Sequence, residues 1–148
     1  MVARDDGVGG TAMSGKRLLP SDAMVDELDL PFWRACADEQ FLVHRCDACG
    51  RAYWPASCCI DHGGTAMQWV PASGRGVVHT FTVFHHAYDP SLSDQLPYVI
   101  AVVRMVEGVS LLGRLTGVPV DGARVGMPVR FAGAAANAEP AVITFRPR

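Results

Sequence analysis

The sequence has 148 residues, 49% of them hydrophobic, and a formal net charge of −2 from 13 Lys and Arg against 15 Asp and Glu. This length allows one domain with a small appendage, and the charge balance disfavours nucleic acid and other polyanionic partners. No run approaches the roughly 18 apolar residues that span a bilayer, so we expect no membrane partner.

The N-terminal part of the sequence divides into a tail and a helical segment. Residues 1–20 are rich in glycine and polar side chains, which predicts a disordered tail. They lack the apolar core of a secretory signal, so we expect a cytoplasmic protein. Residues 21–39 carry helical signals, and Pro31 opens a second short segment there. Phe32 and Trp33 fall on one helical face, which we expect to pack on the domain.

Residues 40–72 contain two near-copies of one pentapeptide. CDACG (46–50) is matched by CIDHG (59–63), so sulfur or imidazole stands at each end of the same short turn. Such a turn places two side chains on one side of a tight bend, and the glycine that follows can take the left-handed conformation that completes it. Short strand-like runs flank the two turns, namely residues 40–46, 51–55 and 67–71.

Two such turns facing each other supply four ligands, the tetrahedral set of a closed zinc site. The predicted ligands are Cys46, Cys49, Cys59 and His62. Cys59 is preferred to Cys58 because only Cys59 repeats the spacing of the first turn, but Cys58 stays open as the third ligand. Because protein groups fill all four positions, we expect a structural zinc ion that the small ribbon needs in order to fold. The alternative is a metal-free remnant with buried cysteines.

Residues 73–148 are predicted to form a five-stranded β-barrel. Val, Ile, Phe and Thr dominate five segments that Gly, Pro or Asp separate; these are residues 74–86, 97–106, 109–117, 127–134 and 140–147. Glu107 and Gly108 are predicted to form a two-residue hairpin turn. Short strands with no long helix among them indicate an OB-fold, and an SH3-like barrel is the alternative.

A second group of candidate residues lies where the first barrel strand meets a long polar loop. His85 and His86, followed by Tyr88, end that strand, and Tyr98 begins the next. We consider His85, His86 and Tyr98 as residues of a substrate channel or a partner face. The alternative is an exposed strand end with ordinary polar residues.

The order of these parts resembles the acyl-CoA-associated zinc-ribbon/OB-fold family, small proteins once filed as a domain of unknown function. The resemblance covers about residues 28–147 and nearly the whole chain without its tail. It is carried by PFW (31–33), RCDACG (45–50), Pro55, CIDHG (59–63), Trp69, GRGVVHTFTVFHH (74–86), LPYVIAVVRMVEG (96–108) and RVGMPVRF (124–131). The family usually has a cysteine where His62 stands and a proline where Ile60 stands. Histidine still binds zinc.

This resemblance implies a mainly β fold with an N-terminal helix, a rubredoxin-like zinc ribbon and a five-stranded OB-fold barrel. It also implies a non-catalytic accessory subunit of a thiolase-fold enzyme, which is a thiolase, an acyltransferase or a lipid-transfer-protein-like aldolase. Acyl-CoA would be a ligand of that complex, and the partner would carry the catalytic groups. The sequence agrees, because it has no nucleophile elbow and no phosphate-binding loop after a strand.

Two other functions stay open at the sequence level. OB-folds and zinc ribbons also form nucleic-acid-binding modules, but these want a basic groove with stacking aromatic side chains. The only lysine, Lys16, lies in the tail. A freestanding hydrolase of acyl thioesters would need a nucleophile and a base that the sequence does not single out.

Overall fold

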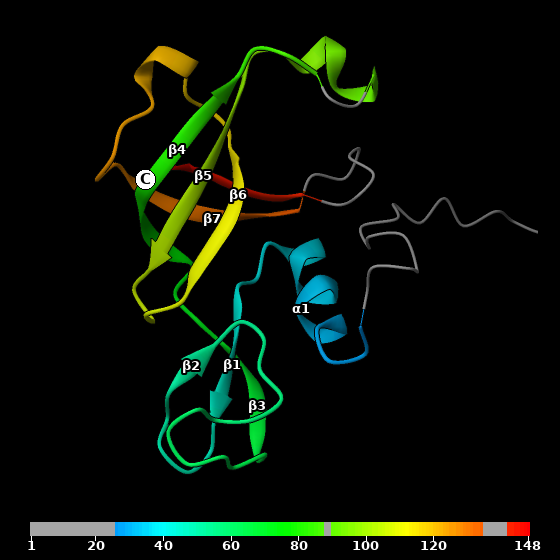
Figure 1. The fold of residues 1–148 in the computed structure, drawn as a ribbon, viewed down its shortest axis with the longest axis vertical. Coiled ribbons are helices and arrows are strands. Elements are labelled where there is room, and N and C mark those ends of the chain that lie inside the picture. The colour runs from blue at the N-terminus through cyan, green and yellow to red at the C-terminus, as the bar shows by residue number, and fades with distance from the viewer. Residues whose placement is uncertain (1–25, 88–89, 135–141) are drawn as a thin grey trace, which may run out of the picture.

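A computed structural model describes residues 26–87, 90–134 and 142–148 of the chain. It consists of a short helix, a three-stranded ribbon and a closed five-stranded barrel, and the ribbon and barrel lie at opposite ends of the molecule (Figure 1). This architecture confirms the predicted fold class. The expected tail and Tyr88 lie outside the described residues. The predicted boundaries of the tail, the helical segment, the ribbon and the barrel stay a prediction.

The helix begins where Pro31 predicts it. α1 (Leu30–Ala35) has this proline in its first turn, where the missing N–H costs nothing. It continues into the 3-10 turn η1 (Cys36–Asp38), which ends at Glu39 in the left-handed conformation with φ of 52°. The helical structure is therefore short, because only two turns separate the proline from this reversal of the chain.

The ribbon is a three-stranded antiparallel sheet with its strands in the order β2-β1-β3. Its strands are β1 (Leu42–Cys46), β2 (Ala52–Tyr53) and β3 (Met67–Pro71). His44 lies in the buried middle of β1, and its ring stacks on Trp69 of β3 with ring centroids 4.7 Å apart. This pair supplies the ribbon with a small aromatic core of its own.

The barrel closes in the order β4-β5-β6-β8-β7. Its strands are β4 (Arg75–Phe84), β5 (Tyr98–Met105), β6 (Ser110–Leu115), β7 (Pro128–Ala134) and β8 (Ile143–Pro147). Two short 3-10 turns lie in its loops, η2 (Pro90–Gln95) and η3 (Val120–Gly122). Every neighbouring pair is antiparallel except β6 and β8. The barrel is the predicted OB-fold rather than the SH3-like alternative.

Two features of the sequence allow the barrel to close. β4 has ten residues, pairs with both β5 and β7, and contains a bulge between Val78 and Thr80 that bends it. On β6, Gly113 faces the interior, where an added Cβ would lie 2.7 Å from Cε2 of Phe145. The glycine therefore makes room for the fully buried Phe145 ring.

The hairpin between β5 and β6 differs from the prediction. Met105 donates its N–H to the carbonyl of Val109 at 2.8 Å, and Gly108 donates to the carbonyl of Met105 at 3.0 Å. The loop therefore has three residues, because Val106 belongs to it and donates its own N–H to β4. The predicted two-residue turn of Glu107 and Gly108 was wrong, although Gly108 does supply the left-handed residue, with φ of 90°.

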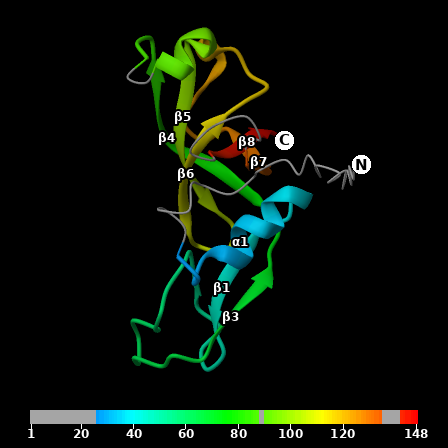
Figure 2. The ribbon, with the colours of Figure 1, turned by 90° about the vertical axis from the view of Figure 1, so that its right-hand side faces the viewer.

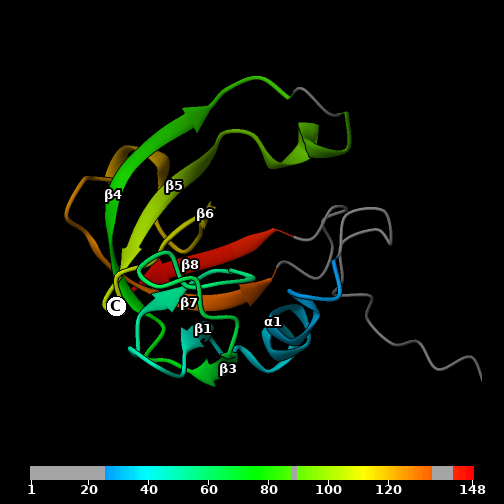
Figure 3. The same ribbon diagram turned by 60° about the horizontal axis from the view of Figure 1, so that its bottom comes forward.

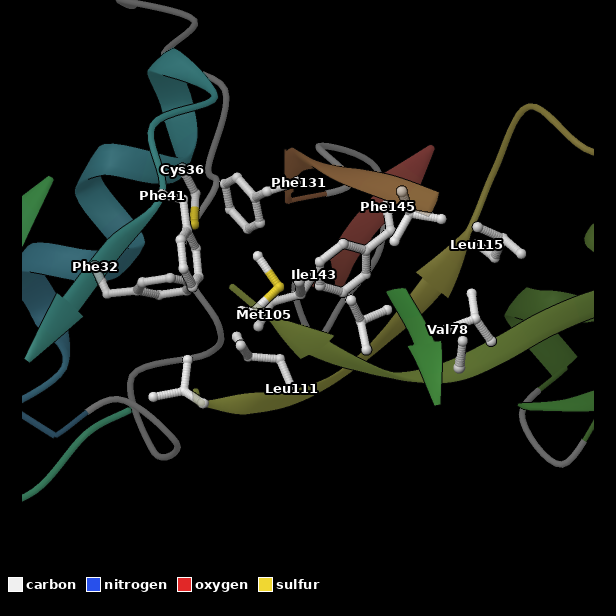
Figure 4. Close-up of a cluster of buried hydrophobic side chains, with 14 of the residues drawn as sticks. Phe32, Cys36, Phe41, Val78, Met105, Leu111, Leu115, Phe131, Ile143 and Phe145 are labelled. Carbon is white, nitrogen blue, oxygen red and sulfur yellow. The ribbon is translucent and has the colours of Figure 1, made fainter. Parts of the chain in front are cut away.

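Phe32 joins the helix, the ribbon and the barrel into one core. Its ring is fully buried. The ring centroid lies 4.8 Å from that of Trp54 and 6.0 Å from that of Trp69 in the ribbon region, and 5.9 Å from that of Phe131 in β7. Figure 4 shows Phe32 and Phe41 facing the barrel side chains. α1 also contacts β1 (Figure 2), and η1 contacts β7 (Figure 3). The helical segment thus fixes the ribbon against the barrel.

Candidate metal centre

Each pentapeptide of the ribbon folds into the same tight turn. Gly50 donates its N–H to the carbonyl of Cys46, and Gly63 donates to the carbonyl of Cys59, both at 2.8 Å. The φ angles of the two glycines are 74° and 71°, a conformation that costs other residues roughly 1–2 kcal/mol. The structure confirms that a left-handed glycine completes each turn.

The two turns bring four potential ligand atoms together. One atom each of Cys46, Cys49, Cys59 and His62 lies within 4.8 Å of all the others. Cys46 Sγ is 3.3 Å from His62 Nε2, and Cys49 Sγ is 3.6 Å from Cys59 Sγ. A tetrahedron with Zn–S bonds of about 2.3 Å has sulfur atoms about 3.8 Å apart. The donor set and its spacing therefore fit a tetrahedral zinc ion.

The two adjacent cysteines of the second turn point in different directions. Cys59 is fully buried and faces the other three candidate ligands, whereas Cys58 is exposed and lies outside the group. The fifth cysteine, Cys36, belongs to the helix core, and burial raises the pKa of its thiol to about 12. The geometry thus brings Cys59, not Cys58, to the site.

Tyr53 is a residue of this site that the sequence analysis missed. Its Oη lies 3.2 Å from Cys59 Sγ and accepts the backbone N–H of Ile60 at 3.1 Å. Because that N–H occupies an acceptor position, the hydroxyl hydrogen can point to the sulfur. This donation is the main reason that the pKa of Cys59 is lowered to about 7.

The hydrogen bonds of His62 determine which nitrogen of its neutral ring carries the proton. Its Nδ1 accepts the N–H of Gly64 at 3.1 Å, which places the proton of a neutral ring on Nε2, facing Cys46. Binding a metal ion through Nε2 requires the proton on Nδ1 instead. Zinc binding through Nε2 would therefore move the ring proton to Nδ1 and break the Gly64 hydrogen bond, while Nε2 already faces Cys46.

Arg51 follows the first turn of the metal centre and contacts the second turn. Its guanidinium forms an ion pair with Asp61 of the second turn and lies 5.6 Å from the centre of the Tyr53 ring. Three thiolates around one divalent ion would leave a charge of about −1. Because Arg51 is paired with Asp61 at an exposed position, it offsets little of that charge.

The second group of candidate residues lies at the far end of the barrel from the ribbon (Figure 1). His85 and His86 follow β4 and are exposed. Tyr98 stacks on Phe84 with ring centroids 5.1 Å apart, and the Arg114 guanidinium lies 4.9 Å from its ring centre. Tyr98 and Arg114 also line a crevice of about 310 Å³. The structure therefore does not bring these residues to the metal centre.

Comparison with known proteins places the whole arrangement in one family. The model of the C-terminal OB-fold domain of ChsH2 matches residues 69–134. A solved chain described as "Ltp2-ChsH2(DUF35) aldolase" is 30% identical, with a TM-score of 0.73, and the match covers 84% of this chain and 97% of that one. The chain belongs to the DUF35 family.

Two curated proteins are also similar to this chain. A "DUF35 domain-containing scaffold protein" of Methanocaldococcus jannaschii is 29% identical over 81% of this chain and 88% of its own length. A "probable enoyl-CoA hydratase alpha subunit" of Thermomonospora curvata is 34% identical over 93% of this chain. The DUF35 chain spans only 42% of that hydratase subunit. None of the helices in the described part of the chain is long and apolar enough to cross a membrane.

Proposed function

We propose that this DUF35 chain is a non-catalytic accessory subunit of an acyl-CoA-processing complex. Its partner is a thiolase-fold enzyme, for which a thiolase, an acyltransferase and a lipid-transfer-protein-like aldolase are the candidates. The observation that carries the proposal is the likeness to the chain described as "Ltp2-ChsH2(DUF35) aldolase", which extends over 97% of that chain. The name of the scaffold relative in Methanocaldococcus jannaschii points in the same direction.

Within this proposal, Cys46, Cys49, Cys59 and His62 hold a structural zinc ion. The spacing of their donor atoms supports this ligand set. Zinc would supply a rigid cross-link between the two turns. Four protein ligands complete a tetrahedron and leave no position for water or substrate, which is the arrangement of structural rather than catalytic sites. The ligands brace the ribbon, and the partner carries out the chemistry.

His85, His86 and Tyr98 form the proposed acyl-CoA or partner face of the barrel. Support comes from the crevice beside Tyr98 and from the Arg114 guanidinium over its ring, since such sites combine apolar walls with a few polar groups. The face borders the loop after β4.

Mixing the purified chain with a candidate thiolase-fold subunit tests this function. We expect a stable complex on size-exclusion chromatography, and acyl-CoA turnover that is higher in the mixture than in the partner alone. The isolated chain should not hydrolyse a panel of acyl thioesters. No complex and no change in turnover with any of the three partner classes would contradict the proposal. Micromolar binding of single-stranded DNA at low salt would instead favour a nucleic-acid-binding module.

A further inference from the structure

Three arginines lie side by side on the outside of the barrel. Arg75 of β4 is directly opposite Arg130 of β7, and Arg130 is directly opposite Arg146 of β8. Directly opposite residues of antiparallel strands project from the same face of the sheet. These three residues, which we call the arginine row, therefore cross three neighbouring strands about 4.8 Å apart.

The positive charge of the arginine row is largely uncompensated. Arg146 pairs with Glu39 at 2.9 Å. Arg75 and Arg130 are exposed, and their guanidinium groups have no ion pair or hydrogen bond within the part of the chain that the structure describes. Like charges directly opposite each other destabilise a sheet. The row is also a local feature, since the whole chain carries a net charge of −2.

A crevice lies directly beside the arginine row. It has a volume of about 400 Å³ at the junction of ribbon and barrel, and its walls include Glu39 and Arg130 besides Ser73 and the buried Phe41 and Phe131. This face therefore combines a recess of mixed polar and apolar lining with the guanidinium groups of the row, of which Glu39 neutralises only that of Arg146. Burial of such a recess contributes far more to binding than exposed ion pairs alone.

The form of the row favours a protein segment over a small anion. An exposed ion pair contributes only about 0–1 kcal/mol, so a lone phosphate would gain little from arginines without buried donors around them. Several carboxylates on one rigid segment add their contributions. Residues three and four apart on a helix have Cβ atoms about 5–6 Å apart, close to the spacing of the row. Alternate residues of a strand lie about 6.6 Å apart, which matches the spacing of the arginine row less well.

We propose that the arginine row docks an acidic helix of the partner enzyme, with carboxylates on one helical face crossing β4, β7 and β8. This inference rests on the proposed function, because the helix belongs to the partner subunit. An apolar side chain of the same helix enters the crevice beside Arg130. The uncompensated charge lowers the stability of the free chain and is neutralised when the complex forms.

The Arg75→Gln/Arg130→Gln variant separates a docking role from a structural one. Because the substitutions remove like-charge repulsion, the free variant should unfold at the same or a higher urea concentration than the wild type. Its affinity for the partner subunit, measured by calorimetry, should fall at least about tenfold. The wild-type affinity should also fall between about 50 mM and 200 mM salt, more steeply than that of the variant. Unchanged affinity and unchanged salt dependence in the variant would overturn the inference.

A matched control removes the same charge elsewhere. Arg34→Gln/Arg124→Gln replaces two exposed arginines outside the row and should keep the wild-type affinity; an equal loss in this control would mean that net charge alone matters. If the wild type binds no partner subunit, the proposed function fails.

A peptide probe then still tests the row. We would titrate the isotope-labelled chain with a helical peptide of about 20 residues that carries glutamate at every fourth position. Amide shifts should cluster at Arg75, Arg130 and Arg146. Absent shifts there, or stronger binding of inorganic pyrophosphate at the same residues, would overturn the proposal.

Discussion

Gly64 leaves the space that the imidazole of His62 occupies. A Cβ added to Gly64 would lie 2.6 Å from Cε1 and 2.8 Å from Nδ1 of that ring. The backbone of Gly64 does not have a left-handed φ, so an added side chain would cause no backbone strain there. The fourth candidate ligand of the metal centre therefore depends on the lack of a side chain two residues later.

The Gly64→Ala variant should consequently lose zinc, because the displaced His62 ring no longer faces Cys46. Bound zinc per chain, measured by plasma emission after dialysis, should fall well below that of the wild type. Adding His62→Cys to Gly64→Ala should restore zinc, since a thiol is smaller than an imidazole and is also a zinc ligand. Full zinc content in Gly64→Ala alone would contradict this reading of the site.

The left-handed glycine of the second turn gives a different prediction. Gly63→Ala introduces a strain of roughly 1–2 kcal/mol at φ of 71°, and it should lower both the melting temperature and the retention of zinc against a chelator. Gly126 is the matched control, with φ of 82° and no atoms within 4 Å of an added Cβ. Gly126→Ala should lower the melting temperature only. Equal zinc retention in the two variants would show that the turn does not control the metal site.

The choice between the two adjacent cysteines is testable by single substitutions. Cys59→Ser should empty the site and unfold the ribbon, because Cys59 is buried among the other ligands. Cys58→Ser changes an exposed side chain outside the group and should leave the zinc content near that of the wild type. Mass spectrometry under native conditions measures the zinc bound to each of the two variants. The opposite pattern would assign the third ligand to Cys58.

How far the sequence predicts this structure depends on the range of each interaction. The two turns are local, so the repeated spacing of Cys46 to Cys49 and Cys59 to His62 was enough to predict their conformation. The contacts of Tyr53 with Cys59, and of Arg75 with Arg130, depend on how segments far apart in the chain are paired. No pattern within one segment contains that information, so both were found only in the structure.

The extra residue in the β5–β6 hairpin has a similar origin. Val106 is β-branched and reads as a continuation of β5, but its N–H bonds to β4 instead of β6. Because Val106 bonds to β4, the pairing between β5 and β6 stops at Met105, one residue earlier than the side-chain pattern indicates. The five barrel strands themselves were predictable, because alternation of buried and exposed residues survives in β5, β6 and β7.

The hydrogen bond from Tyr53 predicts how zinc retention depends on pH. The pKa of Cys59 is about 7 in the folded chain against 9.0 ordinarily. Between these values the folded thiol has lost its proton while the unfolded one keeps it, so the free energy of unfolding rises with pH in this window and falls as the pH drops through about 7. Removing the donor with Tyr53→Phe should shift zinc release to higher pH. Release into a coloured chelator measures this, and superimposable curves for the two proteins would refute it.

The position of Phe32 between three elements predicts a large stability effect. Phe32→Ala leaves a cavity between α1, the ribbon and Phe131 of β7, and such changes cost about 3–5 kcal/mol. Urea unfolding followed by tryptophan fluorescence should show this loss, because Trp33, Trp54 and Trp69 surround the cavity. Leu112→Ala removes a side chain that is 64% exposed and should change stability far less. A loss below about 1 kcal/mol for Phe32→Ala would mean that ribbon and barrel are stable without this contact.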